Sequence, residues 1–221
     1  MHAQEYIDLV KSTLDALDPK SLDQLVDAFH TTYSKGGNIY TMGNGGSGAS
    51  ASHAAGDFLK GASYGLDKRF KMICLNDNLP SMMAIANDIG WESIFIEPLK
   101  NFLQPQDLVI GISGSGNSKN VVAALEYANE KGATTVALSG FKGGKIAQIA
   151  TINVHAPVMD MEVTEDVHMV IFNIVKKTND GALNGRKSID GINVRSKNRI
   201  NEAVRANWGS WLHRAKTPKG Y

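Results

Sequence analysis

The sequence predicts an α/β fold in which helices cover both faces of a five-stranded parallel sheet. Short apolar runs alternate with helical patterns along most of the 221 residues, as expected of strands joined by crossover helices. The runs are rich in Val and Ile, which is typical of strands buried on both faces. Two of them lead directly into loops of glycine and serine. Ligands of such sheets bind beyond the carboxyl ends of the strands, so these loops are candidate binding sites.

The periodicity of apolar residues places the elements. Two amphipathic helices are expected ahead of the sheet, over 3–16 and 21–35, with Ser21 as the N-cap of the second. We expect strands at 38–42, 70–75, 107–112, 134–138 and 151–155. Further helices are expected at 48–60, 80–87, 91–99, 118–132 and 164–178. Turn residues then predominate, apart from one short helix expected at 198–214. We therefore divide the chain into a domain of residues 1–178 and a C-terminal extension of residues 179–221.

Composition excludes several classes of protein. Hydrophobic residues make up 43% and charged residues 20% of the chain, which is ordinary for a globular protein. No apolar run approaches the roughly 20 residues of a membrane-spanning helix, and the N-terminus lacks the apolar core of a signal peptide. The single cysteine, Cys74, has no partner for an internal disulfide and lies in an apolar run. We therefore expect a buried thiol and a cytoplasmic protein that does not bind membranes.

The net charge of +1 conceals a basic C-terminus. From Lys176 onward 11 Lys and Arg residues face 3 acids, whereas the preceding residues hold 12 basic and 19 acidic ones. Trp208 and Trp211 lie among these basic residues, close to Arg205, Arg214 and Lys216. Such a tail could contact nucleic acid or a partner protein. We favour the alternative, in which the tryptophans pack on a neighbouring subunit and the charges are solvated.

The loop Ser113-Gly-Ser-Gly-Asn-Ser118 has the composition of a phosphate-binding loop. Its three hydroxyls alternate with glycines, which let the backbone approach an anion and turn its N–H groups inward. The helix expected to follow adds a partial positive charge. The alternative is a flexible turn capped by Ser118. A second loop, Gly43-Asn-Gly-Gly-Ser47, follows the first strand in the same way. It supports the phosphate interpretation, although glycine after a strand also serves helix–sheet packing.

Two groups of titratable residues lie on predicted helices. His53 and Asp57 are spaced i,i+4 and so share one helix face. This arrangement suits general acid–base catalysis, metal binding or a plain surface ion pair. Glu165, Asp166 and His168 open the last helix of the domain, where Thr164 could be the N-cap. Acids in a first turn stabilise the helix dipole, but so dense a group could also serve proton transfer.

Together these motifs resemble the sugar isomerase (SIS) domain family, and within it the phosphoheptose isomerase group. The resemblance covers roughly residues 1–178, in order, and includes Asn87-Asp88 as well as both loops and both titratable groups. It implies a three-layer α/β/α, flavodoxin-like fold and a homotetramer with active sites at subunit interfaces. The phosphate would be bound by Ser113, Ser115 and Ser118, and the sugar by Asn44, Ser47 and Asp88. Four further residues complete the implied substrate-binding set, namely Gly45, Gly46, Asn87 and Asn117.

The implied reaction converts sedoheptulose 7-phosphate into D-glycero-D-manno-heptose 7-phosphate. Such aldose–ketose isomerisation proceeds through an enediol, because a base moves a proton between C1 and C2 while another group manages the oxygens. A hexose or pentose phosphate presents the same phosphate and carbonyl groups. The resemblance alone favours the heptose.

Three positions depart from the family pattern. Asp57 stands where the family has its catalytic glutamate, Glu165 where it has a glutamine, and Asn173 where it has an acid–base histidine that binds zinc in some members. We expect Asp57 to be the base and Glu165 or His168 its partner. His53, Asp57 and Glu165 would together suit zinc or another divalent ion. The alternative function is a non-catalytic SIS protein that binds phosphosugars as a sensor or scaffold, because asparagine cannot transfer a proton at neutral pH.

Overall fold

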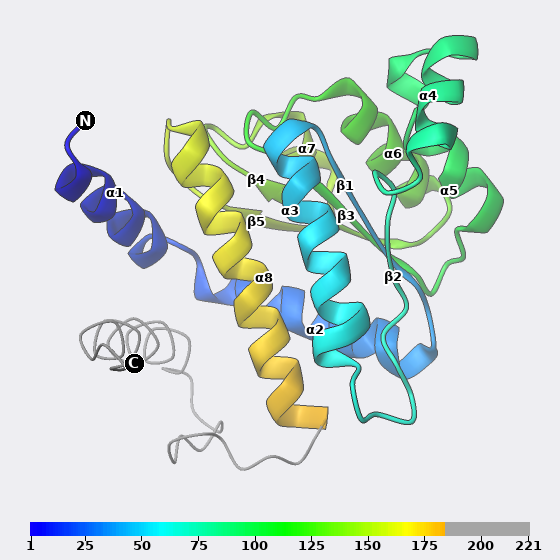
Figure 1. Ribbon diagram of the computed structural model, residues 1–221, viewed down its shortest axis with the longest axis horizontal. Coiled ribbons are helices and arrows are strands. Elements are labelled where there is room, and N and C mark those ends of the chain that lie inside the picture. The colour runs from blue at the N-terminus through cyan, green and yellow to red at the C-terminus, as the bar shows by residue number, and fades with distance from the viewer. Residues whose placement is uncertain (184–221) are drawn as a thin grey trace, which may run out of the picture. The chain divides into compact units, whose positions relative to one another are not determined.

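The computed structural model describes residues 1–183 of the chain (Figure 1). The first two helices, α1 (Ala3–Asp15) and α2 (Pro19–Lys35), agree with the sequence-based expectation. Most of the predicted C-terminal extension lies outside the described residues. This includes the helix expected at 198–214 and the two tryptophans of the basic tail. The division of the chain after residue 178 stays a prediction, and the last described helix continues past it to Leu183.

The sheet has the five parallel strands that the sequence predicts. They are β1 (Ile39–Gly43), β2 (Met72–Cys74), β3 (Leu108–Ser113), β4 (Thr134–Ser139) and β5 (Ile152–His155). Their order is β2-β1-β3-β4-β5, and every neighbouring pair is parallel. The strand order reverses between β1 and β3, which is the topological switch point where such sheets bind ligands. Because Gly43 pairs with Ile112, the glycine and serine loops leave the sheet side by side.

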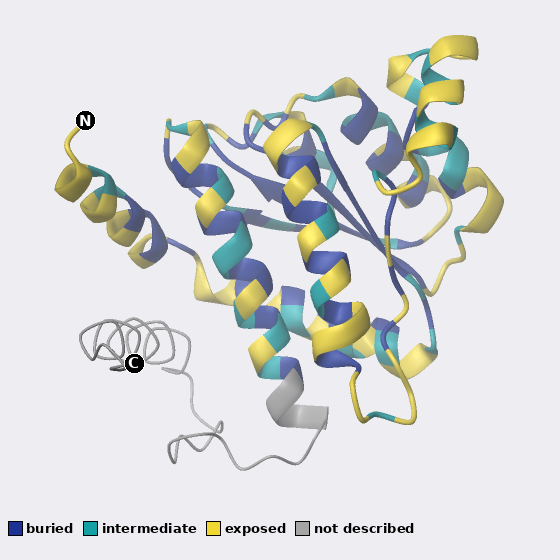
Figure 2. Ribbon diagram, in the orientation of Figure 1, coloured by how far each residue is buried: buried dark blue, intermediate teal, exposed yellow. Residues whose placement is uncertain are grey.

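Helices cover both faces of this sheet, so the three-layer arrangement is confirmed. On one face lie α2, α3 (Gly45–Gly56) and α8 (Met161–Leu183), with α3 and α8 adjacent (Figure 1). The other face is covered by α5 (Ile96–Phe102), α6 (Lys119–Glu130) and α7 (Gly144–Ile149). All residues of β1 and β3 are buried, as the dark blue centre of Figure 2 shows. The thiol of Cys74 is buried at the end of β2, as expected.

Four short elements refine the pattern. The α3 helix continues into a π-helical turn, η1 (Asp57–Ala62), and α4 (Leu79–Asp88) is followed by a 3-10 turn, η2 (Trp91–Ser93). The sequence pattern did not predict α7, because this helix has only six residues and begins within the glycine pair 143–144. Among the described residues, no helix combines the length and the apolar character that crossing a membrane requires.

The helix starts correct two sequence-based expectations. Asp18, not Ser21, is the N-cap of α2, and its carboxylate accepts hydrogen bonds from the backbone N–H groups of Lys20 and Ser21, both at 3.2 Å. Pro19 at the first helical position favours this earlier start. At α8, the carboxylate of Asp160 accepts a hydrogen bond from Val163 N at 3.0 Å. Thr164 is therefore already inside the helix, and the acids that follow it lie beyond the first turn.

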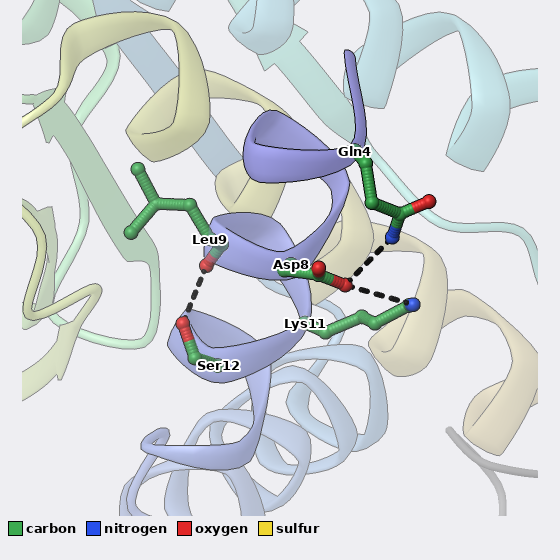
Figure 3. Close-up of polar contacts among 5 residues, drawn as sticks. All are labelled: Gln4, Asp8, Leu9, Lys11 and Ser12. Carbon is green, nitrogen blue, oxygen red and sulfur yellow. Dashed lines mark hydrogen bonds and ion pairs between the residues drawn. The ribbon is translucent and has the colours of Figure 1, made fainter. Parts of the chain in front are cut away.

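The N-terminal helix α1 packs against α8. Val10 and Leu14 are buried, and the hydroxyl of Tyr6 donates a hydrogen bond to Asp166 Oδ2 at 2.8 Å. Polar side chains on its exposed side pair locally, because Gln4 and Lys11 both donate to Asp8 Oδ1 (Figure 3). Asp166, one of the acids singled out in the sequence, thus attaches α1 to α8.

Candidate functional site

The serine loop brings three hydroxyl groups together at the end of β3. Ser113 Oγ lies 3.5 Å from Ser115 Oγ and 3.1 Å from Ser118 Oγ. Ser118 is the N-cap residue of α6, yet its side chain forms no capping hydrogen bond. Its hydroxyl therefore stays available to a ligand in front of the positive end of the helix. This geometry suits an anion, whereas a plain capped turn would use the Ser118 hydroxyl for the helix.

Gly116 fixes the shape of this loop. Its φ of +69° is a conformation that side-chain-bearing residues rarely adopt. A Cβ at this position would collide with the carbonyl oxygen of Gly143, in the loop that precedes α7. The Asn117 side chain also joins the serine loop to the start of α7. It donates a hydrogen bond to Ser115 O at 2.9 Å and accepts one from Lys145 N at 3.0 Å. Asn117 thus holds the loop in shape with its side-chain atoms.

The glycine loop lies beside the serine loop and is tied to it. The side-chain amides of Asn44 and Asn120 exchange two hydrogen bonds, each 2.9 Å long. Asn120 is almost completely buried in the first turn of α6. The Asn76 side chain, at the end of β2, bonds both Gly43 N and Gly43 O, at 3.3 and 2.8 Å. Ser47 is buried under the loop. Sequence reasoning missed Asn76 and Asn120, because only the fold brings them to this loop.

The start of α8 lies over both loops. A Cβ on Gly46 would overlap the carboxylate of Glu165, so this side chain rests directly on the first turn of α3. In the same way Gly114 faces Met161 and Gly140 faces Thr164. Burial, together with the neighbouring carboxylates of Glu162 and Asp166, raises the pKa of Glu165. Glu165 therefore lies beside the glycine loop and releases its proton less readily than an ordinary glutamate.

His53 and Asp57 form a second group, further along the same pair of helices. His53 Nε2 lies 3.9 Å from Asp57 Oδ2, and the ammonium group of Lys176 on α8 lies 3.0 Å from the same oxygen. Asp57 begins the π-helical turn that ends α3, an element often found at functional sites. The sequence pattern predicted the pairing of His53 with Asp57. The sequence pattern did not indicate that Lys176 would pair with Asp57.

Comparisons with known proteins identify the family of this chain. The family model of the SIS domain matches residues 5–140. The chain belongs to the SIS domain family. A probable phosphoheptose isomerase of Thermoplasma volcanium is 33% identical over 178 residues, which cover 79% of this chain and 89% of the relative. The phosphoheptose isomerase of Pelobacter propionicus is 35% identical over 153 residues, covering 69% and 78%.

A solved structure gives the same result. The phosphoheptose isomerase of Neisseria gonorrhoeae superimposes with a TM-score of 0.74 at 25% identity, over 80% of this chain and 94% of that one. Within the SIS domain family, the chain therefore groups with the phosphoheptose isomerases. This membership implies that the domain binds a phosphosugar.

The two groups of acids in this SIS domain lie far apart within one chain. The Glu165 side chain contacts Gly46, and the Lys176 side chain contacts Gly61. Because the later residue of α8 contacts the later glycine, α3 and α8 run in the same direction. Asp57 follows Gly46 by three helical turns, which at 1.5 Å per residue is about 16 Å along the helix. A single chain therefore cannot direct Asp57 and Glu165 at the same atoms of a sugar.

The predicted metal set is not assembled within one chain. Of its three members, only His53 and Asp57 lie together, and no group of three His, Cys, Asp or Glu side chains suited to a metal ion occurs among the described residues. The ammonium group 3.0 Å from Asp57 already neutralises that carboxylate. Two donors beside a lysine make a poor site for zinc within one chain. We therefore derive no chemical step through a metal.

His168 is placed differently from the sequence-based expectation of an acid–base residue. Its side chain is completely buried, and Nε2 lies 3.1 Å from the carbonyl oxygen of Ser139. Burial lowers the pKa of His168 to about 4, and nearby His155 acts in the same direction. The imidazole is therefore neutral at pH 7 and does not reach the surface where a sugar could bind. It supports the end of β4 beneath the serine loop.

Asn87 and Asp88 lie at the exposed end of α4, where the Asn87 amide donates to Asp88 Oδ1 at 2.7 Å. Within residues 1–183, no side-chain hydrogen bond links them to either loop. A cavity of about 410 Å³ lies elsewhere, beside the C-terminus of α2, with Tyr33, Lys68 and Phe70 in its lining. It is remote from the carboxyl ends of the strands. The candidate site of this SIS domain is instead the surface formed by the two loops and the start of α8.

Proposed function

We propose that this protein is a phosphosugar isomerase that converts sedoheptulose 7-phosphate into D-glycero-D-manno-heptose 7-phosphate. The observation that carries the proposal is the convergence of Ser113, Ser115 and Ser118 within 3.5 Å at the N-terminus of α6. These hydroxyls suit the phosphate group. The adjoining glycine loop, with Asn44 and the turn at Gly45 and Gly46, offers polar groups for the sugar hydroxyls. The choice of a heptose follows the named relatives.

Asp57 acts as the base in this proposal. Its carboxylate moves a proton between C1 and C2 of the bound sugar, the step that enediol chemistry requires. Glu165 lies beside both loops and, with its raised pKa, is suited to hold a proton for the sugar oxygens. Since His168 is buried, Glu165 is the better partner of the two that the sequence offered.

The separation of Asp57 and Glu165 favours a site shared between subunits. About 16 Å of helix lies between Gly46, where α3 contacts Glu165, and Asp57, too far for one phosphosugar carbon to meet both carboxylates of the same chain. A homotetramer with interfacial sites would combine the loops of one subunit with Asp57 of another. Closed symmetric assemblies of this kind are common among soluble proteins.

A panel of ketose phosphates tests the activity. Purified protein, with and without added zinc, is incubated with heptulose, hexulose and pentulose phosphates, and aldose formation is followed by ¹H NMR. We expect turnover, fastest with sedoheptulose 7-phosphate. Binding of these sugars without any turnover would instead identify a phosphosugar sensor, the function that Asn173 would allow.

Replacing the base tests the mechanism. Asp57→Asn keeps the size of the side chain but cannot accept a proton. We expect kcat to fall at least a thousandfold, on the order of the loss when a general base is removed, with phosphosugar binding by calorimetry unchanged. Asp67→Asn is the matched control on the surface. Full activity of Asp57→Asn would refute the assignment of the base.

A further inference from the structure

We propose that Lys176 is a further catalytic residue of this isomerase, stabilising the negative charge that develops on the sugar oxygens. The proposal rests on the proposed isomerase function and on the role of Asp57 in it. The ammonium group of Lys176 lies 3.0 Å from Asp57 Oδ2, so a sugar carbon in reach of this base is also near the lysine.

The burial of Lys176 distinguishes this ion pair from the others in the described part of the chain. Its side chain is 18% exposed, whereas the lysines of the four other lysine–carboxylate pairs are 48% to 79% exposed. A charge removed from water acts more strongly on a neighbouring charge, because the surrounding dielectric constant is lower. Asp57 is 32% exposed, so the pair stays open to a ligand on one side.

Gly61 makes room for the ammonium group. A Cβ on Gly61 would lie 2.8 Å from Lys176 Nζ and 2.9 Å from Lys176 Cε. The lysine thus occupies the space of the missing side chain, within the same π-helical turn that Asp57 begins. The turn therefore places the carboxylate and fixes the position of the cation beside it.

The chemistry needs such a cation. When the Asp57 carboxylate takes the proton from C1, the C1–H electron pair forms the C1=C2 bond and the carbonyl π pair moves onto O2. Lys176 donates a proton to O2 and takes the proton of O1. As O1 becomes the new carbonyl oxygen, C2 receives the proton held by Asp57. Both side chains are thereby restored, and no further reactant is consumed. Asn173, one helical turn before Lys176, has no proton to give at neutral pH.

Two kinds of variant test the role of Lys176. Lys176→Met removes the charge and keeps much of the length, whereas Gly61→Ala keeps the lysine and displaces its ammonium group. The matched controls are Lys177→Met, at an exposed neighbour, and Gly56→Ala, where a Cβ would meet nothing within 4 Å. Turnover of sedoheptulose 7-phosphate, thermal unfolding and binding of the corresponding alditol phosphate are measured for each protein.

We expect Lys176→Met to lower kcat about a hundredfold, as loss of one charge-stabilising donor does, and Gly61→Ala to lower it at least tenfold through misplacement. Both should bind the alditol phosphate as the wild type does, and Lys176→Arg should recover part of kcat. The controls should keep wild-type kcat.

Wild-type kcat in both Lys176→Met and Gly61→Ala would overturn the inference and leave the isomerase function standing. A wild-type protein that isomerises no sugar phosphate would overturn both. If Lys176→Met does not fold, Gly61→Ala decides, because the atoms it displaces are the far end of a flexible side chain. A fall in unfolding temperature with unchanged kcat would assign Lys176 to helix packing and overturn the catalytic role.

Discussion

At the scale of single residues, the site depends on contacts between residues far apart in the sequence. The serines at 113, 115 and 118 could be predicted, because their spacing and their position after a strand are visible in the chain. The roles of Asn120 and Lys176 could not be predicted, since each depends on a partner far away in the sequence, Asn44 for the first and Asp57 for the second. His168 misled the sequence analysis for the same reason. Its position near the start of α8 suggested proton transfer, but burial is a property of the packed helix.

The raised pKa of Glu165 predicts a pH dependence of stability. Burial raises this pKa above its unfolded value, so the protonated form favours the folded state. The stabilisation is complete at pH values below the unfolded pKa and is lost as the pH rises through the folded pKa. Glutamine does not ionise, so Glu165→Gln does not lose this stabilisation as the pH rises. We therefore expect its thermal midpoint to exceed that of the wild type at pH 7, by no more than a few degrees because the group is partly solvated.

Thermal unfolding between pH 4 and pH 8 checks this expectation. The difference between Glu165→Gln and wild type should shrink toward pH 4, and Glu126→Gln, on α6, serves as the surface control. A difference that grows toward low pH would contradict the assigned cause.

At the scale of elements, periodicity predicted every strand and most helices, because apolar spacing reports directly which face is buried. The ends of the elements and α7 escaped it. Asp18 and Asp160 precede the expected caps by a few residues, and a cap is a single side chain without periodicity. The helix α7 is too short to show a repeat, yet its preceding loop shapes the serine loop through Gly116.

Gly116→Ala tests this dependence of one loop on the other. The new Cβ would carry the strain of a φ of +69° and would also displace the backbone of the Gly143 loop. We expect a loss of about 3 kcal/mol or more in the free energy of unfolding, since backbone strain and overpacking act together. Phosphosugar affinity should fall as well.

Gly65→Ala is the matched control, because Gly65 has a φ of +81° and nothing within 4 Å of the added Cβ. Gly65→Ala should lower the free energy of unfolding only by the backbone strain, roughly 1–2 kcal/mol. Equal losses in urea unfolding for the two variants would show that the contact with Gly143 does not matter.

At the scale of the whole molecule, the described chain leaves apolar side chains in water. Met83, Ile89 and Trp91 in and around α4 are 55% to 62% exposed, and Figure 2 shows α4 largely yellow. Exposed apolar surface of this kind is typical of an interface. The sequence marked α4 as a helix but could not show that these apolar side chains stay exposed among the described residues. Together with the separation of Asp57 from Glu165, this surface favours assembly with further copies.

Mixing two inactive variants tests whether the sites are shared. Asp57→Asn lacks the base, and Ser113→Ala/Ser118→Ala lacks two of the three proposed phosphate hydroxyls, so each should be inactive alone. If one subunit supplies the loops and another supplies Asp57, random hybrids contain about a quarter of intact sites, since each contribution is intact with a chance of one half. Co-expressed hybrids, confirmed by native mass spectrometry, should therefore regain about a quarter of wild-type kcat. If both groups instead served one site within a chain, every hybrid site would carry one of the two defects and no activity would return.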